Sequence, residues 1–284
     1  MKNDQKNFKV AIVCSAALFF IAACGGAGAT PNDSAAPTSR KTAMPAQLTP
    51  SSTHSFHEAL VSFNMSRWHM ASWSNGGYFL NSWHPGQLFF ENGALLIKLQ
   101  ADPDFVTGKS AVSGEYRTHQ NFHYGLYQAR IKASNTPGTI NGFFVYTGPA
   151  EGTQHDEIDI EIKGDNPTQI QVNYWSGDVE HPTLIDLGFD ASDAEHNYAF
   201  RWSEGAIEWF VDGRLVHQED GSDGSLPVTP GKIILNHWGT VGAAPWSSEY
   251  EASAKPSVMA ASHVSFTSAS ALAARAYPDS QVLK

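Results

Sequence analysis

The chain has 284 residues, of which 42% are hydrophobic, 12% aromatic and only 16% charged. Its net charge of −10 argues against a polyanion such as nucleic acid as partner and favours a neutral ligand that aromatic side chains can contact. Gly and Pro are frequent, which is typical of an all-β domain with many turns.

The N-terminus has the features of an export signal. Three lysines in residues 1–9 precede an apolar run over residues 10–23 that is too short to span a bilayer comfortably. The run ends in Ala-Ala-Cys-Gly at residues 22–25, which resembles a bacterial lipobox. We expect a signal peptide over residues 1–23 and a lipid on Cys24, with an ordinary signal peptide cleaved nearby as the alternative. Gly25 favours the outer membrane or cell surface as the location; without the anchor, the protein would be secreted.

Composition divides the rest of the chain. Residues 24–53 are rich in Ala, Ser, Thr and Pro and predict a flexible tether, because they cannot form a core. We expect one folded domain over residues 54–267 and a C-terminal tail over residues 268–284, which forms either a short helix or a loose segment. Both cysteines, Cys14 and Cys24, precede the domain, so it has no intrachain disulfide.

Within the domain, short strand patterns alternate with turn signals. Residues 88–90 and 94–97 flank an Asn-Gly pair, Asn92-Gly93, and predict a hairpin with a tight turn. Further strands are predicted over residues 124–132, 143–146, 198–202, 207–211, 214–217 and 233–238, with Asp212-Gly213 as the turn between residues 207–211 and 214–217. Many short strands at this spacing predict a sandwich or jelly roll.

One segment, residues 155–164, alternates with the two-residue period of a strand. Its apolar face carries three isoleucines: Ile158, Ile160 and Ile162. Its opposite face carries three carboxylates: Glu157, Asp159 and Glu161. Like charges on one strand face repel each other, so this arrangement costs stability and suggests a functional reason.

Glycoside hydrolysis offers such a reason. A retaining glycosidase needs one carboxylate as nucleophile and one carboxylic acid as proton donor, about 5–5.5 Å apart. Crowding keeps the group from ionising fully, so one member can hold a proton near neutral pH. Residues four apart on a strand lie about 13 Å apart at Cα, so the side chains must lean together on a curved strand. The alternative is a solvated acidic strand face.

The next strand pattern, residues 169–175, places polar side chains and a Trp on one face: Gln169, Gln171, Asn173 and Trp175. If it pairs antiparallel with Lys163 opposite Gln169, Asp159 faces Asn173 and Glu157 faces Trp175. A slip of one residue would turn these side chains to the core. Trp175 as a core aromatic is the alternative.

Other polar pairs alternate in the same way. Asn236 and Trp238 share a strand face, as do Glu115 and Arg117, for which a surface ion pair is the alternative. The twelve histidines are scattered and predict no zinc site.

Several short motifs together point to a known family. They are Ser-Asn-Gly-Gly at 74–77 with Phe79 and Trp83, Gly-Glu-Tyr-Arg at 114–117, Tyr-Gly-Leu-Tyr at 124–127, Phe-Phe-Val-Tyr-Thr-Gly-Pro at 143–149, Glu-Ile-Asp-Ile-Glu at 157–161, Asp-Leu-Gly-Phe-Asp-Ala at 186–191, Trp-Phe-Val-Asp-Gly at 209–213, Pro-Gly-Lys at 230–232 and Asn-His-Trp at 236–238. With these motifs the sequence resembles the bacterial endo-β-1,3-1,4-glucanases (lichenases) of glycoside hydrolase family 16.

This resemblance implies a concanavalin-like β-jelly-roll sandwich with a concave substrate cleft. It implies Glu157 as nucleophile, Glu161 as general acid/base and Asp159 as the residue that assists the nucleophile. The five-residue signature lacks the extra residue of the laminarinase-like branch, which favours the lichenase and xyloglucan-active branch. The implied sugar contacts are Asn75, Phe79, Glu115, Arg117, Phe144, Tyr146, Asn173, Trp175, Asn236 and Trp238.

The sequence departs from the lichenase pattern in three places. His155 stands where many lichenases have Trp, as in the plant xyloglucan transglycosylase/hydrolases. Asn81 and Ser113 stand at the positions of the lichenase disulfide. Family members often carry a structural calcium with an Asp ligand near the C-terminus, but residues 262–266 read Ser-His-Val-Ser-Phe.

These observations predict a retaining endo-β-glucanase that hydrolyses β-1,3-1,4-glucan by double displacement and needs no cofactor. We expect a monomer that binds β-glucan, contacts the membrane only through its anchor and binds no nucleic acid. The alternatives are a xyloglucan endo-hydrolase or transglycosylase and a non-catalytic glycan-binding lipoprotein on the same fold.

Overall fold

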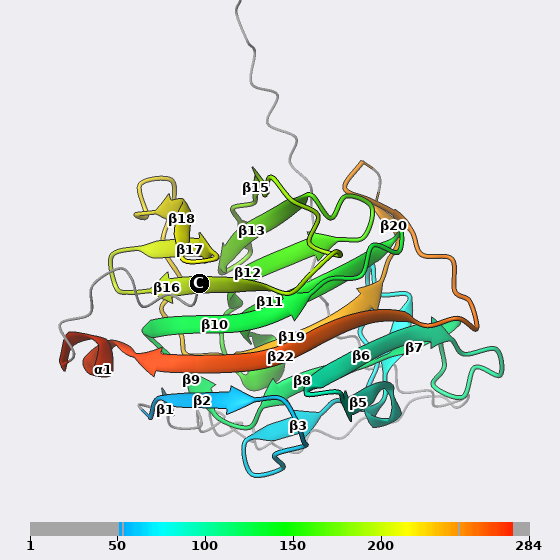
Figure 1. Cartoon of the computed structure of the whole chain (residues 1–284). Coiled ribbons are helices and arrows are strands. Elements are labelled where there is room, and N and C mark those ends of the chain that lie inside the picture. The colour runs from blue at the N-terminus through cyan, green and yellow to red at the C-terminus, as the bar shows by residue number, and fades with distance from the viewer. Residues whose placement is uncertain (1–50, 53, 244, 275–284) are drawn as a thin grey trace, which may run out of the picture.

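The computed structural model describes residues 51–52, 54–243 and 245–274, and these form two large β-sheets that lie over each other (Figure 1). The predicted signal peptide, Cys24 and most of the predicted tether lie outside the described residues. No helix in the described part of the chain has the length and apolarity needed to cross a membrane.

The first sheet has ten strands. Its order is β18 (Arg214–Glu219), β17 (Ile207–Val211), β16 (His196–Trp202), β10 (Gly125–Lys132), β22 (Ser257–Ser268), β6 (Ala94–Ala101), β7 (Ala111–Ser113) and β4 (Asn81–Trp83), with β2 (Phe56–Ala59) paired to β22 and β5 (Leu88–Glu91) paired to β6.

The second sheet has eight strands. Its order is β14 (Val179–Glu180), β13 (Gln169–Ser176), β12 (Asp156–Lys163), β11 (Thr139–Thr147), β19 (Lys232–Gly239), β8 (Glu115–Thr118) and β3 (Trp68–Met70), with β15 (Thr183–Asp186) paired to β13.

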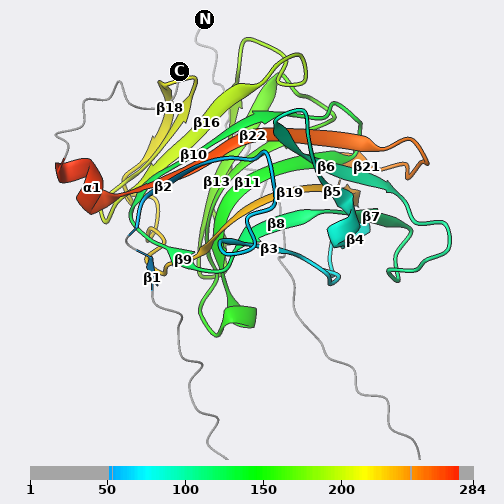
Figure 2. The same ribbon diagram turned by 60° about the horizontal axis from the view of Figure 1, so that its bottom comes forward.

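Smaller elements complete the described chain. Two further strand pairs are β1 (Ser51–Ser52) with β9 (Asn121–Phe122) and β20 (Val241–Ala243) with β21 (Ser247–Glu249). The helical turns are η1 (Pro85–Gln87), η2 (Pro149–Glu151) and α1 (Ala269–Ala274). Figure 2 shows the segment between β11 and β12, which carries η2, extending away from the sheets. The all-β sandwich predicted from the strand patterns is confirmed.

The core lies between the sheets, and the apolar face of the acidic strand β12 packs into it. Ile158, Ile160 and Ile162 of β12 are each at most 1% exposed. From the other sheet, Trp209 on β17 donates a hydrogen bond from Nε1 to the backbone oxygen of Asp159, at 3.1 Å. Apolar burial and this bond fix which face of β12 points outward, so its carboxylates must face away from the core.

The hairpins follow the turn residues. Asn92 and Gly93 both have positive φ, 53° and 82°, as the tight turn between β5 and β6 requires. Asp212 and Gly213 turn β17 into β18 in the same way, with φ of 48° and 77°. Both hairpins are therefore confirmed.

Hydrogen bonds occupy the positions of the lichenase disulfide. Asn81 Oδ1 accepts from the backbone N–H of Gly239 at 3.0 Å, and Ser113 Oγ donates to the backbone oxygen of His237. The imidazole of His237 is fully buried between the backbone oxygen of Ile140 (3.0 Å) and Ser257 Oγ (2.8 Å). Polar contacts thus join β19 to β4, β7, β11 and β22 without a covalent link.

Candidate active site

The site is built on the outward face of β12 and its two neighbours. In the register with β13, Glu157 lies opposite Trp175, Asp159 opposite Asn173 and Glu161 opposite Gln171, as the alternation predicts. On the other side, β11 places Tyr146 opposite Glu157 and Phe144 opposite Asp159. The three carboxylates are thus flanked by amides and rings on both sides.

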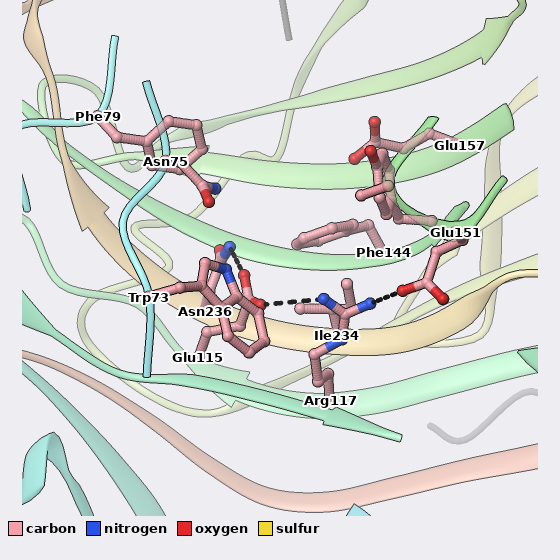
Figure 3. A pocket seen from close by; sticks show the side chains of 12 residues that line it. Trp73, Asn75, Phe79, Glu115, Arg117, Phe144, Glu151, Glu157, Ile234 and Asn236 are labelled. Carbon is pink, nitrogen blue, oxygen red and sulfur yellow. Dashed lines mark hydrogen bonds and ion pairs between the residues drawn. The ribbon is translucent and has the colours of Figure 1, made fainter. Parts of the chain in front are cut away.

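Two cavities meet over these strands. The acidic cavity, of about 110 Å³, is lined by Tyr78, Phe79, Glu157, Asp159, Glu161, Gln171, Asn173, Trp175, Glu180, Trp238 and Trp246. The main cavity, of about 310 Å³, is lined by Trp73, Asn75, Phe79, Glu115, Arg117, Phe144, Tyr146, Ala150, Glu151, Glu157, Ile234 and Asn236 (Figure 3). Phe79 and Glu157 belong to both, so the cavities form one cleft with Glu157 at their junction.

Every residue that the sequence predicts for catalysis or sugar contact lines one of these two cavities. The structure therefore brings together residues that are up to 163 positions apart in the chain, from Asn75 to Trp238.

Burial raises the pKa of two carboxyl groups of the trio, Asp159 and Glu161. Asp159 is 5% exposed; burial first, and then the charges of Glu157 and Glu161, raise its pKa well above the usual range. Burial, followed by the charge of Glu157, raises the pKa of Glu161 to about 8. Burial and the neighbouring charges thus favour the protonated forms of Asp159 and Glu161.

A chain of side chains orients Glu161. Trp246 Nε1 donates to Gln171 Oε1 at 2.7 Å, and Gln171 Nε2 donates to Glu161 Oε2 at 3.3 Å. Because an indole N–H can only donate, the Gln171 amide must turn its oxygen to Trp246 and its NH₂ group to Glu161. The Lys163 ammonium holds the loop by donating to the backbone oxygen of Trp246 at 3.2 Å.

Amides and a histidine contact the other two acids. Asn173 Nδ2 donates to Asp159 Oδ2 at 3.2 Å. His155 Nε2 lies 2.6 Å from Glu157 Oε2, and its ring stacks on Trp175 with centroids 4.7 Å apart. Each carboxyl of the trio thus has at least one nitrogen partner.

Ion pairs cross the far end of the main cavity. Arg117 lies 3.8 Å from Glu115 and 2.9 Å from Glu151, and Lys232 lies 3.6 Å from the same Glu151. Figure 3 shows Glu115, Arg117 and Glu151 in one line, with Asn236 donating to Glu115 at 3.4 Å. Glu115 is almost fully buried, which raises its pKa.

Aromatic rings form the rim near the acidic cavity. Phe79 stacks on Trp238 with centroids 4.3 Å apart, and Trp238 stacks on Trp246 at 6.1 Å. Such faces suit the apolar faces of sugar rings.

Sequence reasoning missed several lining residues. Trp73, Glu151 and Trp246 lie in connecting segments, where no strand period marks which way a side chain points. The contact of His155 with Glu157 was also missed, although residues two apart in a strand point to the same face. Gln171 could have been found, because it alternates with Asn173 and Trp175.

Calcium binds to six to eight oxygen ligands, usually including carboxylates. Across residues 54–243 and 245–274, no three His, Cys, Asp or Glu side chains are gathered so that they could hold a metal ion. Ser262, near the position expected for the calcium ligand, instead donates to Glu195 Oε2 at 3.1 Å.

Comparison with known proteins identifies the family. The family model described as Glycosyl hydrolases family 16 matches residues 75–255. The chain belongs to this family. The Beta-glucanase of Paenibacillus polymyxa, a curated relative, is 41% identical over 198 residues, covering 69% of this chain and 80% of the relative.

A second relative, the Beta-glucanase of Acetivibrio thermocellus, is 39% identical over 197 residues, which cover 69% of this chain but only 58% of that relative. Among solved structures, a beta-1,3-1,4-glucanase (lichenase) derived from a mouse hindgut metagenome superposes with a TM-score of 0.70 at 36% identity. The match covers 75% of this chain and 98% of that one. These matches confirm the lichenase-like family 16 assignment and the jelly-roll sandwich.

Proposed function

We propose that this family 16 glycoside hydrolase is an endo-β-glucanase that cleaves β-1,3-1,4-glucan with retention of configuration. The observation that carries the proposal is the acidic trio: Glu157, Asp159 and Glu161 line one cavity, where burial raises the pKa of Asp159 and of Glu161. Double displacement needs a proton donor and a nucleophile. Relatives named Beta-glucanase and the lichenase structure support the choice of substrate.

In the first step, Glu157 attacks the anomeric carbon while the proton of Glu161 passes to the glycosidic oxygen. The bond between that carbon and oxygen breaks, and a glycosyl-enzyme forms. In the second step, the ionised Glu161 takes a proton from water, the water oxygen attacks the anomeric carbon, and the bond to Glu157 breaks. Asp159, whose pKa is raised by burial, hydrogen-bonds the Glu157 carboxylate, which orients the nucleophile.

The cleft residues are proposed to hold the glucan across this reaction centre. Phe79, Trp175 and Trp238 offer ring faces on the acidic side. Asn75, Glu115, Arg117 and Asn236 offer hydrogen-bonding groups in the main cavity, where Phe144 and Tyr146 form part of the floor and wall. A neutral polymer suits a chain with net charge −10.

The N-terminal sequence supports a second part of the proposal: export as a lipoprotein anchored through Cys24 at the outer membrane or cell surface. Labelling of growing cells with a radioactive fatty acid should mark the wild-type protein and not Cys24→Ala. An unlabelled wild-type protein would contradict the anchor.

A xyloglucan endo-hydrolase or transglycosylase remains the second candidate, because His155 replaces the Trp of many lichenases and contacts Glu157 directly. A substrate panel separates the two. Purified protein is incubated with barley β-glucan, laminarin and xyloglucan, with Glu157→Gln as the matched blank, and reducing ends and product lengths are measured. The proposal expects release from barley glucan alone; release mainly from xyloglucan would replace it, and binding without release would indicate a glycan-binding protein.

A further inference from the structure

His155 is held as firmly as a residue of the core, although it borders the cleft. It immediately precedes β12 and is 8% exposed. Its ring stacks on Trp175, with centroids 4.7 Å apart and planes 20° apart, and meets Tyr146 edge-on at 5.4 Å. Two aromatic side chains therefore fix the plane of the imidazole.

The contact with Glu157 has a defined direction. His155 Nε2 lies 2.6 Å from Glu157 Oε2. A carboxylate only accepts hydrogen bonds, so Nε2 must carry the proton whenever Glu157 is ionised. Hydrogen bonds to an ionised acceptor are short and about twice as strong as neutral ones.

Two side chains therefore restrain the carboxylate of Glu157. Asp159, on the same strand face, hydrogen-bonds the Glu157 carboxylate, and His155 donates to it at Oε2 from the start of the strand. Glutamate has three rotatable bonds in its side chain, and these two partners limit the orientations that its carboxylate can adopt.

We propose that His155 is a positioning residue for the nucleophile Glu157, and that its N–H stabilises the Glu157 carboxylate as that group leaves the anomeric carbon. This inference rests on the proposed function. Water attacks the anomeric carbon and gives its proton to Glu161. The bond between that carbon and the Glu157 oxygen breaks, and its electron pair returns to the carboxylate that His155 contacts.

Two substitutions separate the hydrogen bond from the packing. His155→Phe keeps a ring between Trp175 and Tyr146 but has no N–H. His155→Gln keeps an N–H donor but loses the ring. If the hydrogen bond positions Glu157 and assists its departure, the Phe variant should lose about 100-fold in kcat, with KM falling as well because the glycosyl-enzyme accumulates, and the Gln variant should recover most of this loss.

The chain contains a matched control. On β18, His217 Nε2 lies 2.8 Å from Glu219 Oε1, again two residues apart, and its ring contacts Trp209 with centroids 5.4 Å apart. This pair lines neither cavity of the cleft. His217→Phe should therefore leave kcat and KM at wild-type values.

A pre-steady-state measurement tests the second half of the proposal. With an aryl β-glucan oligosaccharide that has a dinitrophenolate leaving group, formation of the glycosyl-enzyme needs no proton from Glu161. In the His155→Phe variant the breakdown of that intermediate becomes rate-limiting, so mixing should give a burst of dinitrophenolate equal to the enzyme concentration. Intact-protein mass spectrometry should then show the glycosyl-enzyme as the main species.

The outcomes distinguish failure of the inference from failure of the proposed function. Wild-type kcat in His155→Phe, or equal losses in the Phe and Gln variants without a burst, would overturn the role of His155 while the enzyme assignment stands. An inactive wild-type protein, or an active Glu157→Gln variant, would overturn the proposed function itself. Unfolding midpoints are measured for all variants; if His155→Phe does not fold, His155→Met, which also lacks a donor, takes its place.

Discussion

Glu161 should set the alkaline limit of activity. Burial of its carboxyl group, followed by the charge of Glu157, raises its pKa to about 8. A general acid works only while protonated, so raising the pH through 8 removes the active form. With a pKa of about 8, about 90% of Glu161 is protonated at pH 7 and about 10% at pH 9, so kcat/KM should fall about tenfold. An ordinary Glu would be less than about 1% protonated at pH 7.

The assay compares two leaving groups. kcat/KM is measured from pH 5 to pH 10 for a phenyl and a dinitrophenyl β-glucan oligosaccharide. kcat/KM reports the steps up to formation of the glycosyl-enzyme, in which only the phenyl substrate needs the proton of Glu161. The phenyl profile should therefore fall above pH 8, while the dinitrophenyl profile should stay level.

Thermal unfolding across the same pH range supplies the control for loss of folded enzyme. Two results would refute this prediction: a kcat/KM for the phenyl substrate that already falls near pH 5, or a kcat/KM that falls at the same pH for both substrates. In the first case the burial of Glu161 would not raise its pKa; in the second, another group would control the fall.

Three further predictions concern stability and binding. Burial lowers the pKa of His237 from 6.5 to about 4, so protonation of this side chain favours the unfolded chain. The contribution of neutral His237 to the free energy of unfolding is complete above pH 6.5, and about 3 kcal/mol of it is lost as the pH falls to 4. Urea unfolding at several pH values should therefore show a steeper loss of stability for the wild type than for His237→Gln. Glu151→Gln should raise KM without changing kcat, because it releases Arg117 at the end of the main cavity. A fall in kcat with unchanged KM would contradict this role. The free energy of unfolding should change by less than about 1 kcal/mol. Ile160→Ala should cost about 2–5 kcal/mol in urea unfolding, because the side chain is 1% exposed; a loss under 1 kcal/mol would contradict its place in the core.

The strand β12 and its surroundings were largely predictable, because a period of two residues leaves only two faces to choose between. The isoleucines had to face the core, so the carboxylates had to face the cleft, and pairing with β13 then followed from the same alternation. The turns at Asn92-Gly93 and Asp212-Gly213 were visible because few residues tolerate positive φ.

The longest strand was missed for a physical reason. β22 (Ser257–Ser268) is rich in Ser and Ala, which carry a weak strand signal. It is nevertheless a strand because β10, β6 and β2 pair with it and bury its backbone groups. Pairing between distant segments cannot be read from local alternation. The short helix α1 (Ala269–Ala274), by contrast, was one of the two alternatives expected for the tail.

The site was only partly predictable, because some of the residues that line the cleft lie outside the strands. The floor residues lie on paired strands, but Trp73, Glu151 and Trp246 come from connecting segments whose path depends on tertiary contacts. Trp246, for example, is placed by Lys163 and Gln171, which are more than seventy residues away in the chain. Nothing in the local sequence around Trp246 indicates these partners.

Trapping the glycosyl-enzyme tests the central claim most directly. A 2-deoxy-2-fluoro β-glucan oligosaccharide with a dinitrophenolate leaving group is incubated with the protein, which is then digested and analysed by tandem mass spectrometry. We predict one equivalent of sugar attached to the side chain of Glu157, and no label in Glu157→Gln. A sugar attached to any other residue, or full turnover of natural glucan by a protein that cannot be labelled, would contradict double displacement through Glu157.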